Sequence, residues 1–269
     1  WIGLVGSEMC IRDSPMTIKF FRTAVLAAAT AAAAMTASSA NAYMTFFGED
    51  LNNSASVPLS STPNASAAEA SFLSHLTGVG TETFEGFAAN TAGPLNLSFP
   101  GAGNATLAGG NGSVRKVTQG STNGVGRYGI NSENFWQVAA GGSGNFTVTF
   151  SAPIAAFGFY GIDIGDFGGQ LMLQLNDGSN TQLTVNNTVG SSGSTDGSVL
   201  YYGFIAETAL EQVTEISFQT STGQGDYFAF DNMTIGTFQQ VNVPEPSTVA
   251  VMLVGAIGIG AASRRRLLK

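Results

Sequence analysis

The sequence predicts an all-β protein built as an antiparallel two-sheet sandwich, and three observations support this prediction. From Gly80 onward, short apolar segments are separated by turns rich in glycine, asparagine and aspartate. In residues 145–150, apolar side chains alternate strictly with threonine and asparagine, which is typical of a strand with one buried face. No helical pattern lies between these segments, so we expect antiparallel pairing in two sheets. The many strands and the length of the chain favour a jelly roll over an immunoglobulin-like sandwich.

Twelve segments fit the strand pattern. They are, in chain order, residues 81–87, 95–99, 105–109, 113–117, 134–139, 145–150, 154–164, 170–175, 181–185, 199–205, 213–220 and 227–235. Asn176, Asp177 and Gly178 form a tight-turn signal. This turn predicts that the segments on either side of it pair as a hairpin.

Residues 43–80 are predicted to be an N-terminal segment, partly loop, ahead of a β-sandwich domain at residues 81–240. Residues 51–70 are polar and small, contain two prolines and lack apolar periodicity, so we expect a surface loop. Residues 69–76 can form two turns of an amphipathic helix. The single histidine, His75, falls in this helix, and we expect it to be a solvated surface residue.

The N-terminal region divides into two parts. The string VGSEMCIRDS within residues 1–15 resembles a translated sequencing adapter, so we treat these residues as an artefact. Cys10, the single cysteine, falls inside that part. Residues 16–42 have the basic start, the alanine-rich helical apolar core and the Ala-x-Ala cleavage site, at Ala40 and Ala42, of a secretory signal peptide. We therefore expect export across the inner membrane and processing by signal peptidase.

Residues 243–269 combine three features in a fixed order. A Pro-Glu-Pro turn separates the C-terminal segment from the preceding body. An apolar run at residues 248–262 is close to the shortest helix that spans a bilayer, and a basic cluster holds its far end in the cytoplasm. The turn and the cluster consist of Pro244, Glu245, Pro246, Arg264, Arg265 and Arg266.

This order of features closely resembles the PEP-CTERM sorting signal of Gram-negative bacteria. The resemblance implies recognition by an exosortase, which is a membrane-embedded cysteine protease. It also implies that the short transmembrane helix is removed and that the body is released or anchored at the cell surface. The chain then touches the membrane only through this helix, before processing. An ordinary C-terminal membrane anchor is the alternative interpretation.

The charge of the body limits its partners. Between residues 43 and 246 the chain has 16 acidic side chains and three basic ones, Arg115, Lys116 and Arg127, an excess of 13 negative charges. Binding of phosphate groups requires lysine and arginine, so nucleic acid and anionic lipid are excluded. Divalent cations and neutral glycans remain compatible. With one histidine and no cysteine in the body, zinc sites and nucleophilic triads lack their parts.

Three segments carry a second resemblance. They read GFYGIDIGDFGGQLMLQL at 158–175, DGSVLYYGFI at 196–205 and DYFAFDNMTIG at 226–236. They are similar to the carbohydrate-binding-module-like, galactose-binding-like sandwiches of many PEP-CTERM surface proteins, over roughly residues 81–238. The resemblance supports the fold better than the ligand, because such sandwiches host many functions.

Five acidic residues are candidate calcium ligands, because calcium takes six to eight oxygen ligands. Structural calcium in jelly-roll binding modules commonly joins the first and last strands, which implies Glu85 with Asp231 as the leading pair. Asp163 with Asp166 is the second candidate, and Asp226 lies beside the last strand. The alternative is that these acids form turns and a solvated negative surface.

Five aromatic residues are candidates for contact with a glycan, since sugars stack on exposed rings. They are Trp136, Tyr160, Tyr201, Tyr202 and Tyr227. Phe135 and Trp136 are adjacent in one predicted strand, and Tyr201 and Tyr202 are adjacent in another. One member of such a pair faces the core and the other faces outward. Core packing is the alternative for these rings.

The sequence thus predicts a non-enzymatic, exported surface or matrix protein that is sorted by an exosortase and associated with exopolysaccharide in a biofilm. A calcium-dependent, lectin-like module is the second interpretation. A glycoside hydrolase is the third, but it requires a recognisable pair of catalytic carboxylates, and the sequence has no strand motif that supplies them.

Overall fold

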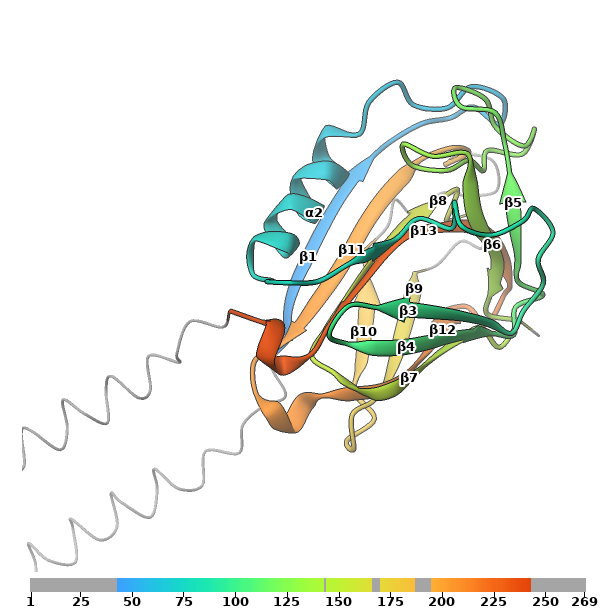
Figure 1. The fold of residues 1–269 in the computed structure, drawn as a ribbon. Helices are drawn as coiled ribbons and strands as arrows, with labels where there is room; N and C mark the ends of the chain where they lie inside the picture. The colour runs from blue at the N-terminus through green and yellow to red at the C-terminus, as the bar shows by residue number, and fades with distance from the viewer. Residues whose placement is uncertain (1–42, 143, 166–169, 187–194, 243–269) are drawn as a thin grey trace, which may run out of the picture. The chain divides into compact units, whose positions relative to one another are not determined.

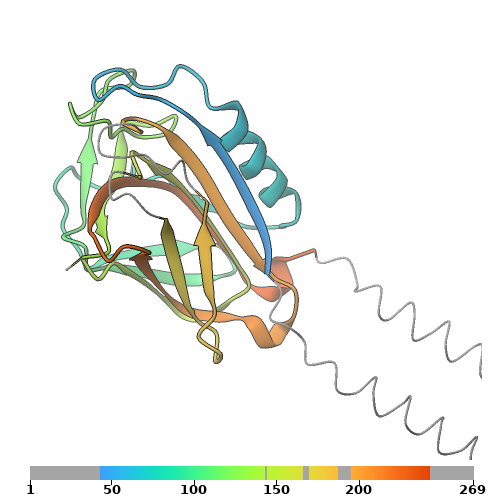
Figure 2. The ribbon, with the colours of Figure 1, turned by 180° about the vertical axis from the view of Figure 1, so that it is seen from behind.

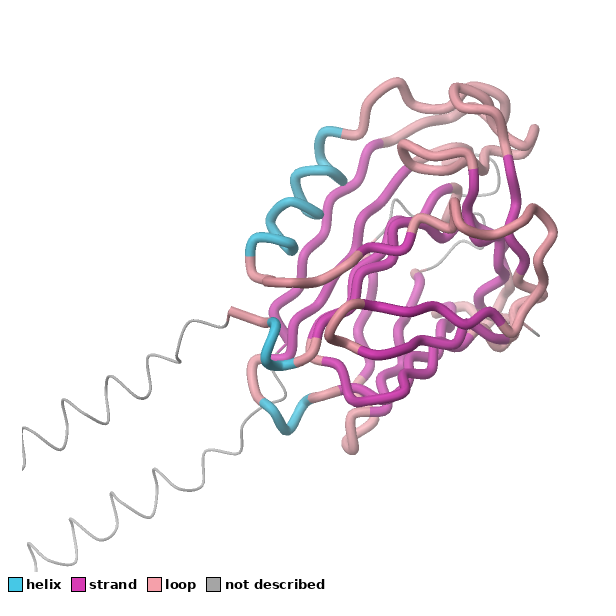
Figure 3. Tube along the Cα trace, viewed as in Figure 1, coloured by secondary structure: helices cyan, strands magenta, loops and turns pink. Residues whose placement is uncertain are grey.

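The computed structural model describes residues 43–142, 144–165, 170–186 and 195–242. The regular secondary structure consists mainly of strands in two sheets, with little helix (Figure 3). This confirms the predicted antiparallel two-sheet sandwich. The predicted signal peptide and the C-terminal sorting region lie outside the described residues. Within the described residues, none of the helices has the length and apolar character needed to cross a membrane.

One sheet has seven strands, in the order β1-β11-β8-β13-β6-β5, with β2 also paired to β13. Its strands are β1 (Tyr43–Asp50), β2 (Thr81–Glu82), β5 (Ser113–Lys116), β6 (Asn134–Ala140), β8 (Ala156–Ile162), β11 (Val199–Ala206) and β13 (Asp226–Gly236). The other sheet has six strands in the order β10-β9-β12-β7-β4-β3. They are β3 (Leu95–Phe99), β4 (Gly103–Ala108), β7 (Thr147–Ile154), β9 (Leu171–Asn176), β10 (Gln182–Val185) and β12 (Val213–Thr220). Short 3-10 helices lie at η1 (Ala209–Glu211) and η2 (Phe238–Gln240).

The two sheets face each other (Figure 2). The core between them is rich in phenylalanine. The rings of Phe159 and Phe230, from the seven-stranded sheet, stack with their centroids 5.1 Å apart. Phe218, from the six-stranded sheet, packs edge-on against Phe159 at 5.5 Å. Strand β9 buries alternate residues, and it pairs with β10 as the predicted hairpin. Apolar alternation in the sequence therefore identified the inward faces of these strands.

Residues 43–80 are part of the sandwich, which corrects the prediction that the domain begins at residue 81. Strand β1 pairs along its full length with β11. Helix α2 (Pro63–Ser74) covers the outer face of the seven-stranded sheet at strands β1, β11 and part of β8 (Figure 1). Strands β8 and β11 are consequently buried on both faces, which explains their continuous apolar sequence.

Helix α2 begins six residues earlier than the predicted helix at 69–76. Pro63 occupies its first turn, where a missing N–H costs no hydrogen bond. The Asp50 carboxylate, at the end of β1, accepts hydrogen bonds from the backbone N–H groups of Asn64 (3.2 Å) and Ala65 (2.9 Å). A cap supplied from β1 therefore sets the start of the helix, and this cap is not visible in the helix's own sequence.

The Phe72 side chain fixes helix α2 against the sheet. It is fully buried beneath the helix, above Gly158 and Gly203, which lie directly opposite each other on β8 and β11. A Cβ atom would lie 3.0 Å from the Phe72 ring at Gly158 and 2.8 Å from it at Gly203. The two glycines thus leave the space that the ring fills.

Candidate functional site

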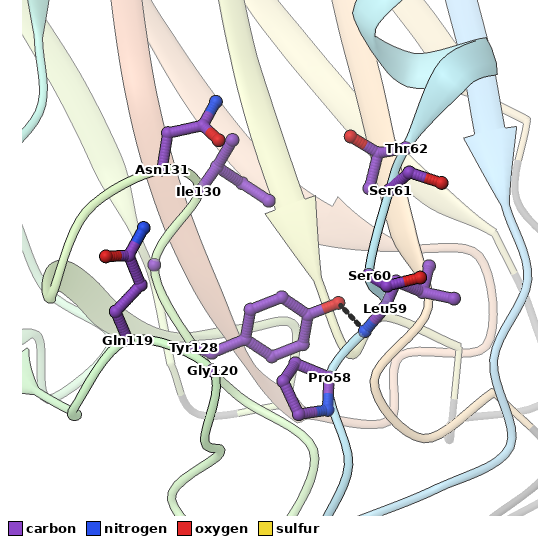
Figure 4. Close-up of a pocket in the computed structure, with 11 residues that line it drawn as sticks. Pro58, Leu59, Ser60, Ser61, Thr62, Gln119, Gly120, Tyr128, Ile130 and Asn131 are labelled. Atoms are coloured by element: carbon purple, nitrogen blue, oxygen red, sulfur yellow. Dashed lines mark hydrogen bonds between the residues drawn. The ribbon is translucent and has the colours of Figure 1, made fainter.

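A pocket of about 250 Å³ lies between two loop regions of the described chain (Figure 4). We call it the tyrosine pocket. One wall is the segment that precedes α2, and the other is formed by the loop between β5 and β6. Its lining residues are Pro58, Leu59, Ser60, Ser61, Thr62, Gln119, Gly120, Tyr128, Gly129, Ile130 and Asn131. They supply hydroxyl groups, amide groups, a tyrosine ring and a proline, and none of them carries a charge.

Tyr128 joins the two walls of the tyrosine pocket. Its ring lies between Gln119 on one side and Ser60 on the other (Figure 4). The Tyr128 hydroxyl donates to the carbonyl of Gly197 at 2.9 Å and accepts the N–H of Leu59 at 3.2 Å. Burial raises the pKa of this hydroxyl to about 12, so it stays protonated at physiological pH. The distance between the walls is therefore set by a buried side chain.

Asp231, one of the predicted calcium ligands, supports the floor of the pocket from below. It is fully buried on β13, and its Oδ2 accepts the N–H of Ile130 at 2.7 Å and the hydroxyl of Ser132 at 3.1 Å. Its Oδ1 accepts the N–H of Asn232 at 2.8 Å. Burial raises the pKa of this carboxyl to about 8 despite these donors.

Asp163, a second predicted ligand, supports the wall that carries Tyr128. It is buried with a left-handed backbone conformation (φ 65°), just beyond the end of β8. Its Oδ2 lies 3.0 Å from Nε of Arg127, and its Oδ1 accepts the N–H of Gly197 at 3.2 Å. This carboxylate therefore holds both the residue before Tyr128 and the residue to which the Tyr128 hydroxyl donates.

Of the three remaining predicted ligands, Glu85 lies close enough to Asp231 to act on its charge, whereas Asp226 binds elsewhere. Asp226 accepts the N–H of Gly165 at 3.3 Å, and Asp166 lies outside the described residues. Glu85 is exposed, and its Oε1 accepts the N–H groups of Glu133 (2.9 Å) and Asn134 (2.6 Å). Among the described residues, no three acidic, histidine or cysteine side chains form a group that could hold a metal ion.

Two amide oxygens, from Asn134 and Asn232, belong to residues that contact or adjoin Glu85 and Asp231. The Oδ1 atoms of Asn134 and Asn232 are buried and have no hydrogen-bond partner among the described residues. The orientation of the Asn134 amide is well determined, because its Nδ2 donates to the carbonyls of Phe84 and Phe87, both at 3.1 Å. Amide and carboxyl oxygens are among the donor types that calcium takes.

Four of the five predicted glycan-contacting rings are in the protein interior, which corrects that prediction. Trp136 and Tyr202 face the core between the sheets, and Tyr160 and Tyr201 face helix α2. Tyr160 donates to Glu69 of α2 at 2.9 Å. Both members of the tyrosine pair are buried because the outer face of the sheet is also covered. A glycan cannot stack on these rings.

Tyr227 is the remaining predicted ring, and it lies at the surface with 36% of its area exposed. Its hydroxyl accepts a hydrogen bond from Nδ2 of Asn111 at 3.2 Å. The guanidinium carbon of Arg127 lies over the ring, 5.9 Å from its centroid. This position is compatible with ligand contact.

The lining of the tyrosine pocket was not predicted from the sequence. Residues 51–70 were expected to be a surface loop, and the loop after β5 gave no motif. The serines at 60 and 61 and the amides at 119 and 131 are common surface residue types. Their positions in one pocket depend on the paths of two loops that are far apart in the chain.

Comparison with sequence families identifies the C-terminal region. Residues 242–266 match the family described as the PEP-CTERM protein-sorting motif. The chain carries a PEP-CTERM sorting motif. The match includes the predicted residues Pro244, Glu245, Pro246, Arg264, Arg265 and Arg266, whose structure lies outside the described residues, as do Ala40 and Ala42. No curated protein matches the chain.

Solved structures that resemble the chain include binding modules and one enzyme. The K2 cleaved adhesin domain of Lys-gingipain has a TM-score of 0.36 at 12% identity, over 59% of this chain and 98% of that one. A family 29 carbohydrate-binding module has a TM-score of 0.25 at 14% identity, over 73% and 92%. An α-L-arabinofuranosidase has a TM-score of 0.37 at 15% identity, over 77% of this chain and 34% of that one. At identities this low, the likeness says nothing about the function of this chain.

Proposed function

We propose that this PEP-CTERM protein is an exported surface protein whose body binds a neutral saccharide in the tyrosine pocket. The composition of the pocket lining carries the proposal. Hydroxyl and amide side chains donate to and accept from sugar hydroxyls, while the Tyr128 ring and Pro58 offer apolar surface to the carbon skeleton. The pocket volume of about 250 Å³ suits one sugar unit.

The charge of the body favours a neutral ligand over an anionic one. Its acidic residues outnumber its basic residues by 13, which raises the energy of an approaching polyanion. Of the three basic side chains, Arg127 pairs with Asp163 and Lys116 with Glu133. We therefore propose a neutral exopolysaccharide of the biofilm matrix as the physiological ligand.

We also propose that the role is non-catalytic. Hydrolysis of a glycosidic bond requires two carboxyl groups on either side of that bond. The described residues that line the tyrosine pocket include no acidic side chain. A glycoside hydrolase remains the competing function, and release of reducing sugar from a bound polysaccharide would reveal it.

The binding proposal predicts the effect of two substitutions in the pocket. We expect Gln119→Ala and Ser61→Ala each to weaken binding of a neutral oligosaccharide about 3- to 10-fold, the loss of one neutral hydrogen bond. Isothermal titration with the purified protein measures this change. Gln239→Ala, an exposed glutamine of η2, is the matched control and should bind like the wild type. Equal affinities for all four proteins would exclude the pocket as the binding site.

The sorting proposal predicts a change in processing. We propose that an exosortase cleaves the chain at its sorting motif, after signal peptidase has removed residues 16–42, and so releases or anchors the body at the cell surface. Replacing Pro244, Glu245 and Pro246 with alanine should leave an uncleaved protein in the inner membrane of a host that contains an exosortase. Immunoblots of membrane and surface fractions detect the size difference. Normal processing of this variant would contradict exosortase recognition.

We further propose that calcium binds beside Glu85 and Asp231, where the orphaned amide oxygens of Asn134 and Asn232 face no donor among the described residues. Calcium at about 100 times its Kd should raise Tm by about 5 °C relative to magnesium or chelator. Asn232→Gly removes one oxygen and tolerates the left-handed backbone at this position (φ 46°). This variant should lose the calcium response. An identical Tm in calcium and in chelator would refute the proposal.

A further inference from the structure

The loop that forms one wall of the tyrosine pocket also contacts a second polar surface. Tyr128 lines the pocket, and the preceding residue, Arg127, places its guanidinium group over the ring of Tyr227. Asn123, in the same loop, donates from Nδ2 to Oε1 of Gln137 on β6 at 3.3 Å. The pocket and the part of the seven-stranded sheet that α2 leaves uncovered are therefore joined through one short segment.

Tyr227 is held in a fixed orientation on that surface. Its backbone pairs with Ala139 of β6, and its hydroxyl accepts a hydrogen bond from Asn111. Arg127 lies over one face of the ring and is itself paired with the buried carboxylate of Asp163. A ring fixed by its backbone, its hydroxyl and one face loses little conformational entropy when a ligand stacks on the face that remains.

Asn111 connects Tyr227 to a second hollow, of about 530 Å³. We call it the glycine hollow, and its lining residues are Ala92, Gly93, Pro94, Ala108, Gly109, Asn111, Gly112 and Ser113. Packing requires a glycine at position 112. A Cβ atom on Gly112 would lie 2.2 Å from Cζ2 of the buried Trp136 ring. The core beneath the hollow therefore leaves no room for a side chain at this position.

We propose that the tyrosine pocket, the Tyr227 ring and the glycine hollow are successive contact points for one extended chain of a neutral polysaccharide. The protein then binds the interior of the chain and not only its terminal sugar. One sugar unit enters the pocket, a following unit stacks on Tyr227, and units beyond it reach the glycine hollow. This inference rests on the proposed saccharide binding and extends it to the class of ligand.

The charges along this path agree with a neutral chain. Among the described residues, Arg127 is the basic side chain that lies over the Tyr227 ring, and its charge is balanced by Asp163. Asn111, Asn123 and Gln137 supply amide groups that donate to and accept from hydroxyl groups. The path from pocket to hollow therefore offers hydrogen bonds and an aromatic face without a net positive charge.

The test compares affinity with ligand length. Purified wild-type protein, from expression of the full chain, is titrated with gluco-, manno- and galacto-oligosaccharide series that run from the single sugar to long oligomers. We expect the affinity for the recognised series to rise with length until the path is filled. Tyr227→Ala should weaken binding of long oligomers about 3- to 10-fold and leave binding of the single sugar unchanged. Tyr227→Phe, which keeps the ring, should retain most of the affinity.

Phe47→Ala is the matched control, because Phe47 is an equally exposed ring (37%) on the edge strand β1. It should bind every oligomer like the wild type. Two results would overturn the extended path and leave the single-sugar pocket. One is an affinity that does not depend on oligomer length. The other is an unchanged affinity in Tyr227→Ala when Gln119→Ala weakens binding. Absence of binding at every length would overturn both proposals. If Tyr227→Ala does not fold, Asn111→Gly, which tolerates the positive φ of that residue, makes the same test for long oligomers.

Discussion

Replacing Phe72 with alanine is expected to lower the free energy of unfolding by about 3–5 kcal/mol. The Phe72 ring is fully buried and fills the space over Gly158 and Gly203, so its removal leaves a cavity between α2 and the sheet. Gly158 and Gly203 have no side chains that could move into this cavity and fill it. Chemical denaturation followed by circular dichroism measures the change.

The neighbouring residue provides the control for this prediction. Ser71 lies on the same helix but is exposed, so Ser71→Ala should change the free energy of unfolding by less than about 0.5 kcal/mol. A loss below about 1 kcal/mol in Phe72→Ala would contradict the account that this ring fastens α2 to the sheet. The Tyr160 and Tyr201 rings under α2 should also become accessible to solvent when Phe72 is removed.

Replacing Asp231 with alanine is the second large change, with an expected loss of about 3 kcal/mol in the free energy of unfolding. The substitution removes the carboxyl oxygens that accept the N–H groups of Ile130 and Asn232, and one of the two acceptors near the Ser132 hydroxyl. Because Ile130 lines the tyrosine pocket, saccharide affinity should fall as well. An Asp231→Ala protein with wild-type stability would show that the carboxylate does not support the pocket floor.

The same residue predicts a pH dependence. In the folded protein, burial raises the pKa of Asp231 from 3.8 to about 8. Its contribution to stability is therefore fully present below pH 3.8 and is lost as pH rises through about 8. Both proteins are measured in chelator. Relative to Asp231→Asn, the free energy of unfolding of the wild type should fall by up to about 1.4 kcal/mol per pH unit between pH 3.8 and about 8. A constant difference between the two proteins from pH 4 to pH 8 would contradict a buried, protonated carboxyl.

The sequence was sufficient to predict most strands of the sandwich, but not β1. Alternation in β9 and the turn after it identify a hairpin, because each side chain's direction follows from a period of two residues. Strands β8 and β11 were also found from their apolar composition. Their burial on both faces was not predicted, because the sequence does not show which segment covers the outer face. Tyr201 and Tyr202 were therefore expected to be divided between core and surface.

The candidate site was less predictable than the fold. The acids at 163 and 231 were selected as candidate calcium ligands, and in the structure both are buried acceptors for backbone N–H groups. Sequence spacing cannot distinguish a carboxylate that binds a ligand from one that binds the loop beside it. The residues that line the pocket come from two loops of ordinary composition. Their proximity depends on hydrogen bonds between the loops, from Leu59 to Tyr128 and from Thr122 and Gly126 to the carbonyl of Ala55.

The position of a bound saccharide tests the central proposal most directly. Backbone amide NMR of the purified protein, titrated with the neutral oligosaccharide that it binds, locates the contacts residue by residue. We expect the largest shift changes in residues 58–62 and 119–131, the two walls of the tyrosine pocket. Saturable shifts confined to other regions, such as the β9–β10 hairpin, or no shifts with any neutral oligosaccharide, would contradict saccharide binding in this pocket.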